Sequence, residues 1–107
     1  MQQAVTHRSA KTQAAPLAAV RGEIRAALEA ARVRVFAAIG AHPRPVAGCD
    51  VEFNRLLEDR ARLAQELARI DTLERSELER LIGDSPDFDA ATRHSLRASL
   101  QRALAVA

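Results

Sequence analysis

Apolar residues recur at helical spacing along most of the chain, and this pattern predicts the elements of the fold. From Pro16, a residue suited to the first turn of a helix, apolar side chains fall within one arc of about 100° on a helical wheel. They are Leu17, Val20, Ile24, Leu28, Ala31, Val35, Ala38 and Ile39. We therefore predict an amphipathic helix from Pro16 to about Ile39. Gly40 ends it, because glycine readily adopts the left-handed conformation of a helix C-terminus.

A second apolar stripe begins after Asp50, which is a candidate N-cap for a second helix. Its members have the spacing of a coiled-coil seam, which Arg60 interrupts once. They are Phe53, Leu56, Leu63, Leu67 and Ile70. We expect all five in the core, together with Leu17, Val20, Ile24, Leu28 and Val35 of the first helix.

The second helix cannot continue with the same face buried, because Glu74 would lie at the centre of its apolar seam. Ser76 with Glu79 three residues later matches a capping box. We therefore predict a restart, with a short helix from about Glu77 to Ile82 that Gly83 closes. One unbroken helix over 50–82 is the alternative.

The segment 84–89 contains Pro86 and several caps, and it predicts a turn into the last helix, with Ser85 and Asp87 as competing N-caps. The apolar stripe of that helix is Leu96, Leu100, Ala103, Leu104 and Ala107, with Leu96 and Leu100 expected in the core. Three main helices, a short fourth and short connections predict an all-α fold, a small antiparallel helical bundle.

The chain has 107 residues, the size of one small domain. Residues 1–15 show no apolar period and carry Arg8 and Lys11 without an acid, so we expect a flexible basic tail before a single helical-bundle domain at 16–107. Leu, Ile, Val and Phe together number 12 + 4 + 7 + 3 = 26. Because a domain of this size buries only about 60–70% of its unfolded surface, we expect self-association to complete the bundle.

Charge and cysteine content exclude several protein classes. One cysteine cannot form an internal disulfide, and no stretch has the length of a signal peptide's apolar core, so we expect a soluble, cytoplasmic protein. The formal net charge is only +2. It divides into +5 over residues 1–49 (seven cations, two acids) and −3 over 50–107 (nine cations, twelve acids). This pattern helps to choose which segments lie side by side.

The groups able to carry chemistry do not converge by spacing. The chain has no His-Glu-x-x-His, no Glu-x-x-His pair and no glycine-rich phosphate loop. We therefore expect no enzyme, no cofactor, no metal and no small-molecule substrate. Cys49, just before a helix N-terminus, is a candidate reactive thiol. His42 is a candidate metal ligand with it, but two ligands make a poor site.

The segment that begins at His94 suggests a more specific function. His94-Ser-Leu-Arg-Ala-Ser99 resembles the phosphohistidine motif of histidine phosphotransfer domains. The resemblance implies an exposed His94 that accepts a phosphoryl group, which Arg97 would neutralise. Those domains carry further long helices after the motif, whereas only thirteen residues follow His94 here. Phosphotransfer is thus an alternative function.

Three arginines, Arg21, Arg25 and Arg32, lie within about 40° of each other on the first helix and offer a possible phosphate contact. Glu29 interrupts the patch, and the absence of Trp and Tyr leaves little aromatic surface on which bases would stack. Weak, nonspecific nucleic-acid binding is the second alternative.

Val33 and Phe36 fall outside the main apolar arc of the first helix. Large apolar side chains in such positions are either covered by the following loop or the last helix, or belong to a contact with another chain, and we favour the second explanation. We therefore expect a non-enzymatic helical protein–protein interaction module, of the kind found in adaptors, chaperone-like proteins and regulatory subunits. Its interaction face contains Val33 and Phe36, and its partner is a second copy or another protein.

Overall fold

The computed structural model describes the backbone of residues 2–43 and 50–106, and the side chains of 16–43 and 50–105. The all-α prediction is confirmed, since the described residues contain helices and no strand. The elements are α1 (Gln2–Ala41), α2 (Val51–Arg69), the 3₁₀ helix η1 (Ile70–Thr72), α3 (Arg75–Asp84) and α4 (Ala90–Val106).

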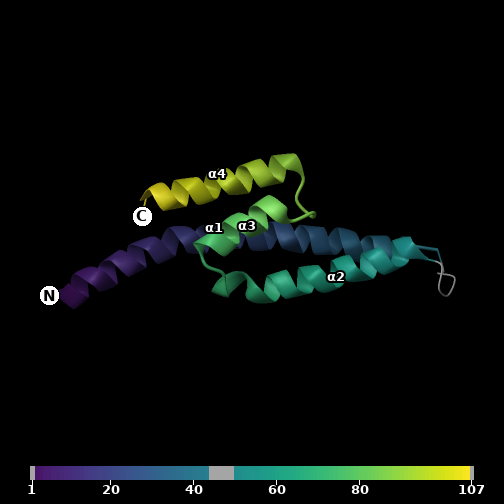
Figure 1. The fold of residues 1–107 in the computed structure, drawn as a ribbon, viewed down its shortest axis with the longest axis horizontal. Helices are drawn as coiled ribbons and strands as arrows, with labels where there is room; N and C mark the ends of the chain where they lie inside the picture. Colours follow the sequence, from purple (N-terminus) through teal and green to yellow (C-terminus); the bar gives the residue numbers. More distant parts are fainter. Residues whose placement is uncertain (1, 44–49, 107) are drawn as a thin grey trace.

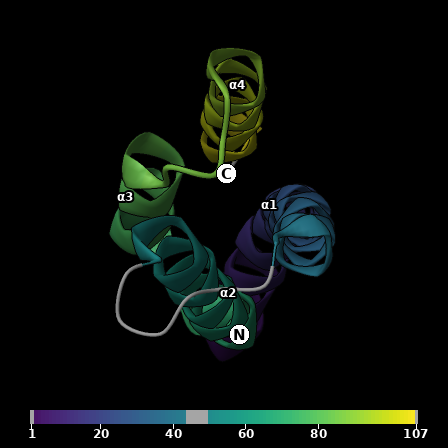
Figure 2. The same cartoon turned by 90° about the vertical axis from the view of Figure 1, so that its right-hand side faces the viewer.

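The helices run alternately up and down around one core (Figure 1). α1 is the longest and packs against both α2 and α4, while α3 packs against α4. Seen end-on, α3 lies across the bundle from α1 (Figure 2). Near the 41–51 connection, α1 and α2 extend beyond α3 and α4, so this end of the bundle is only two helices thick.

Burial follows this uneven thickness. Among the predicted core residues, Val20, Ile24, Leu28, Leu63, Ile70, Leu96 and Leu100 are buried, and Leu17, Val35 and Leu67 are partly buried against them. Phe53 and Leu56 are only half-buried, because they lie where α2 has α1 as its one helical neighbour. The core also contains Leu73, Leu78, Ile82, Phe88 and Ala103.

The predicted start of the first helix is wrong. Helix α1 begins at Gln2, and Pro16 lies inside it. Alanine and glutamine have high helix propensity and are frequent before Pro16. These residues therefore favour a helix even though they show no apolar period. The prediction had placed the helix start where the apolar period begins. The separation of a 1–15 tail from a 16–107 domain stays a prediction.

The predicted restart after α2 is present, but its caps are wrong. Helix α2 begins as predicted, with the Asp50 carboxylate accepting a hydrogen bond from the backbone N–H of Phe53 at 2.8 Å. Helix α3 begins at Arg75, where Glu77 accepts a bond from the Glu74 backbone N–H at 3.3 Å. The observed N-cap, Glu74, therefore lies two residues before the predicted cap, Ser76, and it follows the extended Leu73.

The turn between α3 and α4 also differs from the prediction. Gly83 lies inside α3, which ends where Ser85 adopts an extended conformation. The physical reason is that a residue before proline is disfavoured in helical conformation. Asp89, rather than Ser85 or Asp87, caps α4 by accepting a hydrogen bond from the Thr92 backbone N–H at 2.7 Å. This bond lowers the pKa of Asp89.

Arg93, which is partly buried, holds this turn in place. Its guanidinium donates hydrogen bonds to the backbone carbonyls of Ile82 (3.0 Å), Ser85 (2.6 Å) and Phe88 (3.1 Å). Such bonds satisfy carbonyls at a helix C-terminus that have no intrahelical partner. These bonds hold the α3–α4 connection in place, and Phe88 of this connection is buried in the core.

We predict that Leu63→Ala destabilises the fold by about 2–5 kcal/mol, because it leaves a cavity at a fully buried position in α2. Urea unfolding followed by circular dichroism measures the effect. Val51→Ala, on an exposed position of the same helix, is the control and should change the free energy of unfolding by less than about 0.5 kcal/mol. Equal effects of the two substitutions would contradict the core described above.

Candidate functional site

A second apolar face runs along α1, opposite the side that packs into the core. At 100° per residue its members fall within an arc of about 120°, centred roughly 180° from the buried residues. All of these residues are exposed. Glu29 is exposed in the same arc, and we call the whole set, including Glu29, the outer face of α1. The members are Ala18, Ala19, Gly22, Ala26, Glu29, Ala30, Val33, Phe36, Ala37 and Gly40. Glu29 is their one charged residue, so α1 is apolar on two opposite sides.

Val33 and Phe36 are the large side chains of the outer face, and they are 67% and 45% exposed. The guanidinium carbon of Arg32 lies 5.3 Å from the centroid of the Phe36 ring. Arg32 also donates a hydrogen bond to the Glu29 carboxylate at 3.4 Å. The cation–π contact and the ion pair hold these side chains in one arrangement at the surface.

Apart from Glu29, the remaining members of the outer face are small. A Cβ atom added to Gly22 or to Gly40 would meet no neighbouring side chain within 4 Å. Apart from Glu29, the half of this face that precedes Ala30 consists of glycine and alanine, while the half that follows it carries the two large side chains. A neighbouring helix could approach the small half closely.

His42 joins the two helices at the end of the hairpin. Its Nε2 atom lies 3.5 Å from the Asp50 carboxylate, and its ring centroid lies 5.4 Å from that of Phe53. These contacts give His42 a packing role beside the N-cap of α2. Cys49 lies outside the described residues, so a metal pair with His42 stays untested.

The arginine patch predicted on α1 is engaged within the chain. Arg21 donates a hydrogen bond to the Leu73 carbonyl at 2.6 Å, and Arg25 pairs with the Asp71 carboxylate. Two of the three arginines thus fix η1 and the following residue against α1, and the third, Arg32, pairs with Glu29. A phosphate group would have to compete with these bonds.

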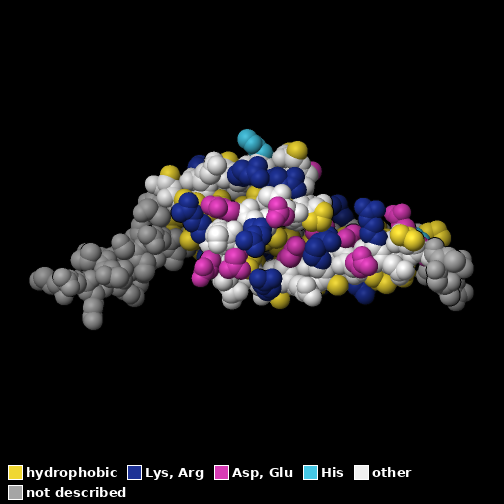
Figure 3. Space-filling view, in the orientation of Figure 1, with side chains coloured by type: hydrophobic (Ala, Val, Ile, Leu, Met, Phe, Trp, Pro, Cys, Tyr) yellow, Lys and Arg dark blue, Asp and Glu magenta, His cyan; other side chains and the backbone are white. Residues whose placement is uncertain are grey.

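His94 and Arg97 lie one turn apart on α4, and both are exposed. Figure 3 shows cationic side chains gathered over α4 on this side of the molecule, and the Arg97 guanidinium lies beside Gly83. This exposure agrees with what the resemblance to histidine phosphotransfer domains implies. Phosphotransfer through His94 stays a prediction.

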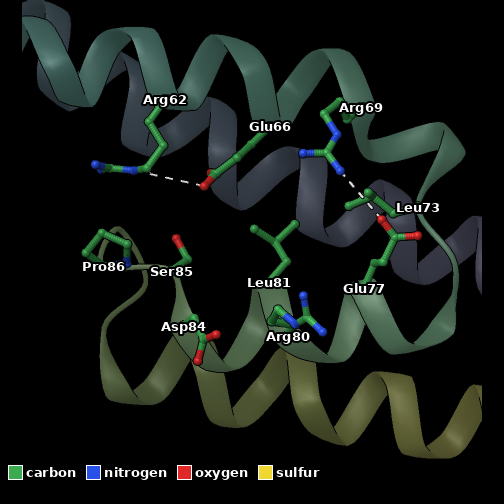
Figure 4. Close-up of a pocket in the computed structure, with 10 residues that line it drawn as sticks. All are labelled: Arg62, Glu66, Arg69, Leu73, Glu77, Arg80, Leu81, Asp84, Ser85 and Pro86. Atoms are coloured by element: carbon green, nitrogen blue, oxygen red, sulfur yellow. Dashed lines mark ion pairs between the residues drawn. The ribbon is translucent and has the colours of Figure 1, made fainter.

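A polar cleft of about 320 Å³ separates α2 from α3 (Figure 4). Arg69 of α2 and Glu77 of α3 point toward each other across it, 3.5 Å apart, and Leu73, Leu81 and Pro86 form its apolar part. The cations are Arg62, Arg69 and Arg80, and the acids are Glu66, Glu77 and Asp84. Because their formal charges cancel, the cleft offers no net charge to attract an ionic ligand.

One end of the cleft is built around Arg62. Its guanidinium donates hydrogen bonds to Asp59 at 3.0 Å and to both carboxylate oxygens of Asp87, at 2.9 and 3.1 Å. Arg62 Nε lies 3.9 Å from Glu66 Oε1, and Glu66 Oε2 is buried without a hydrogen bond. Burial, and then repulsion by Asp87, raise the pKa of Glu66, which Arg62 only partly offsets. This cluster ties α2 to the α3–α4 turn.

The sequence pattern had identified two residues of the outer face, Val33 and Phe36, and had missed its small members. Alanine and glycine are a weak sign of a contact face, because they also occur on helix surfaces that face solvent. Their position opposite the core stripe was nevertheless readable from a helical wheel.

We predict that Glu66→Gln stabilises the protein at neutral pH. A raised pKa in the folded state means that folding favours the protonated carboxyl, so its contribution is full below the ordinary pKa of 4.5 and is lost as the pH rises through the higher folded value. The stability advantage of the variant should therefore be absent below pH 4.5, grow as the pH rises above 4.5, and be complete above the folded-state pKa. Urea unfolding across pH measures it, with Glu58→Gln, at an exposed position of α2, as the control. A difference independent of pH would contradict the assignment.

Comparisons of this chain with protein-family models, curated proteins and solved structures find no match. Among the described residues, no three His, Cys, Asp or Glu side chains are grouped to hold a metal ion. No helix in the described part of the chain combines the length and apolar content needed to cross a membrane. The function therefore has to be inferred from the residues of this chain, and the outer face of α1 is the candidate site.

Proposed function

We propose that this protein is a helical protein–protein interaction module that self-associates by covering the outer face of α1. The observation that carries the proposal is the exposure of Val33 and Phe36 on the side of α1 opposite the core. A helix that is apolar on two opposite sides is typical of a helix with neighbours on both. Among the described residues, α2, η1 and α4 pack on one side of α1, and the members of its outer face are exposed.

The energetic argument is the hydrophobic effect. Full burial of a Val or Phe side chain is worth about 1.5–3 kcal/mol relative to exposure. Val33 and Phe36 realise only part of this in a single chain. A second chain that covers them gains the remainder and also excludes water from the neighbouring alanines.

The partner that fits best is another copy of this chain. An alanine- and glycine-rich helix face permits close approach of a second helix of the same kind, and most soluble homo-oligomers are closed, symmetric assemblies. Such an assembly completes the bundle that a domain of this size builds only in part.

Phe36→Arg tests the proposal. We expect it to weaken self-association by at least about tenfold, equivalent to about 1.4 kcal/mol, because a guanidinium would replace the largest apolar side chain of the contact. Sedimentation equilibrium over a concentration series reaching high micromolar measures the association constant. Circular dichroism should show unchanged helix content, since Phe36 is outside the buried core.

Val51→Arg is the matched control. Val51 is 79% exposed and lies on α2, not on the outer face of α1, so its substitution should leave association unchanged. A wild-type chain that remains strictly monomeric over the whole concentration series would overturn the proposed function.

A further inference from the structure

We propose that the contact between α2 and the α3–α4 turn is a proton-sensitive clasp, which a proton on Glu66 tightens and the loss of that proton loosens. The clasp consists of Asp59, Arg62 and Glu66 of α2 and Asp87 of the turn. It does not depend on the proposed function. It follows from the way in which three carboxylates share one guanidinium.

The hydrogen bonds of Arg62 reach two of the three carboxylates. One terminal nitrogen donates to Asp59 at 3.0 Å, and the other donates to both oxygens of Asp87, at 2.9 and 3.1 Å. Arg62 Nε lies 3.9 Å from Glu66 Oε1, which is beyond hydrogen-bond distance. Glu66 is therefore the carboxylate that Arg62 does not satisfy, and its Oε2 atom is buried without a hydrogen bond.

The charges of the clasp do not balance. When every group is ionised, three carboxylates face one guanidinium, and two negative charges are not neutralised. A buried charge without a partner is unfavourable, so a proton binds where it breaks no hydrogen bond, on Glu66. The raised pKa of Glu66, caused by burial and then by Asp87, agrees with this assignment.

The other charged groups around the clasp are directed elsewhere. Arg34 of α1 and Arg93 of α4 donate hydrogen bonds to backbone carbonyls of the turn, at 3.3 Å to Asp87 and 2.6 Å to Ser85. The formal charges of the remaining charged groups that line the cleft cancel. These groups are Arg69 of α2 and Glu77, Arg80 and Asp84 of α3.

The clasp is the main polar link between α2 and the segment 75–89. Among the described residues, two ion pairs join them, Arg62–Asp87 and Arg69–Glu77. The side chains of Arg69 and Glu77 are 66% and 42% exposed, and exposed pairs contribute little. The side chain of Asp87 is only 9% exposed. An ionised Glu66 weakens this buried link, because it repels Asp87 and competes with Asp87 for Arg62.

Hydrogen exchange of backbone amides tests the clasp. Opening constants, corrected for the pH dependence of intrinsic exchange, are measured from pH 4.5, the ordinary glutamate pKa, to about pH 7.5. The wild-type chain is compared with Glu66→Gln, which has the shape of the protonated carboxyl. The reporter is the Asp87 backbone N–H, which donates to Ser85 Oγ at 3.3 Å. The reference is the Asn54 backbone N–H, near the other end of α2, which donates to the Asp50 carbonyl at 3.2 Å.

The measured quantity is the opening constant of the wild-type chain divided by that of Glu66→Gln at the same pH. An open clasp returns Glu66 to water, so the ionised carboxylate favours opening. At the Asp87 amide we expect the ratio to rise at least about threefold as the pH rises from 4.5. At the Asn54 amide the ratio should stay constant. Glu58→Gln, at an exposed position of α2, should behave as the wild-type chain does.

Two outcomes would refute the clasp. If the ratio at the Asp87 amide does not change with pH, the proton on Glu66 does not control this contact. If the ratio changes by the same factor at the Asn54 amide, the proton acts on the fold as a whole and not on the link between α2 and the turn. Neither outcome bears on self-association, which sedimentation measures separately.

Discussion

The burial of one side of α1 is the interaction on which the rest of the structure depends. Ile24 and Leu28 are completely buried, and α2 and α4 each pack against this same helix. Helix α3 packs against α4 and buries Leu78 and Ile82 in the same core, and Arg62 of α2 bonds to Asp87 in the turn that follows α3. The bundle is therefore organised around one long helix, which explains why the end away from α3 and α4 is thin and only half-buried.

Polar contacts complete the arrangement that the apolar core begins. Arg21 bonds to a carbonyl after η1, and Arg93 bonds to three carbonyls around the α3–α4 turn. Each of these arginines satisfies backbone groups that a helix end leaves without partners. Much of the arginine content of the chain thus serves its internal connections, which lowers the value of net charge as a guide to its partners.

The outer face of α1 and the cleft between α2 and α3 differ in how far their side chains already have partners within the chain. In the cleft, the formal charges of cations and acids cancel, and Arg62 Nε and Glu66 Oε2 are buried without a hydrogen bond. On the outer face, apolar side chains lie uncovered, with Phe36 fixed beneath Arg32. Uncovered apolar surface gains free energy from a partner, whereas balanced charge gains little, so we place the function on α1.

The sequence by itself determined the all-α class, the main apolar stripes and the Asp50 cap, because each depends on local spacing or on one hydrogen bond within a turn. It favoured a break before α3 but placed its cap at the wrong residue and left one unbroken helix as the alternative. The tertiary structure alone decided that Phe88 belongs to the core and that Arg62 gathers Asp59 and Asp87. It also decided that Phe53 is only half-buried. These features depend on which segments meet in space, and a helical period carries no information about the neighbour that covers it.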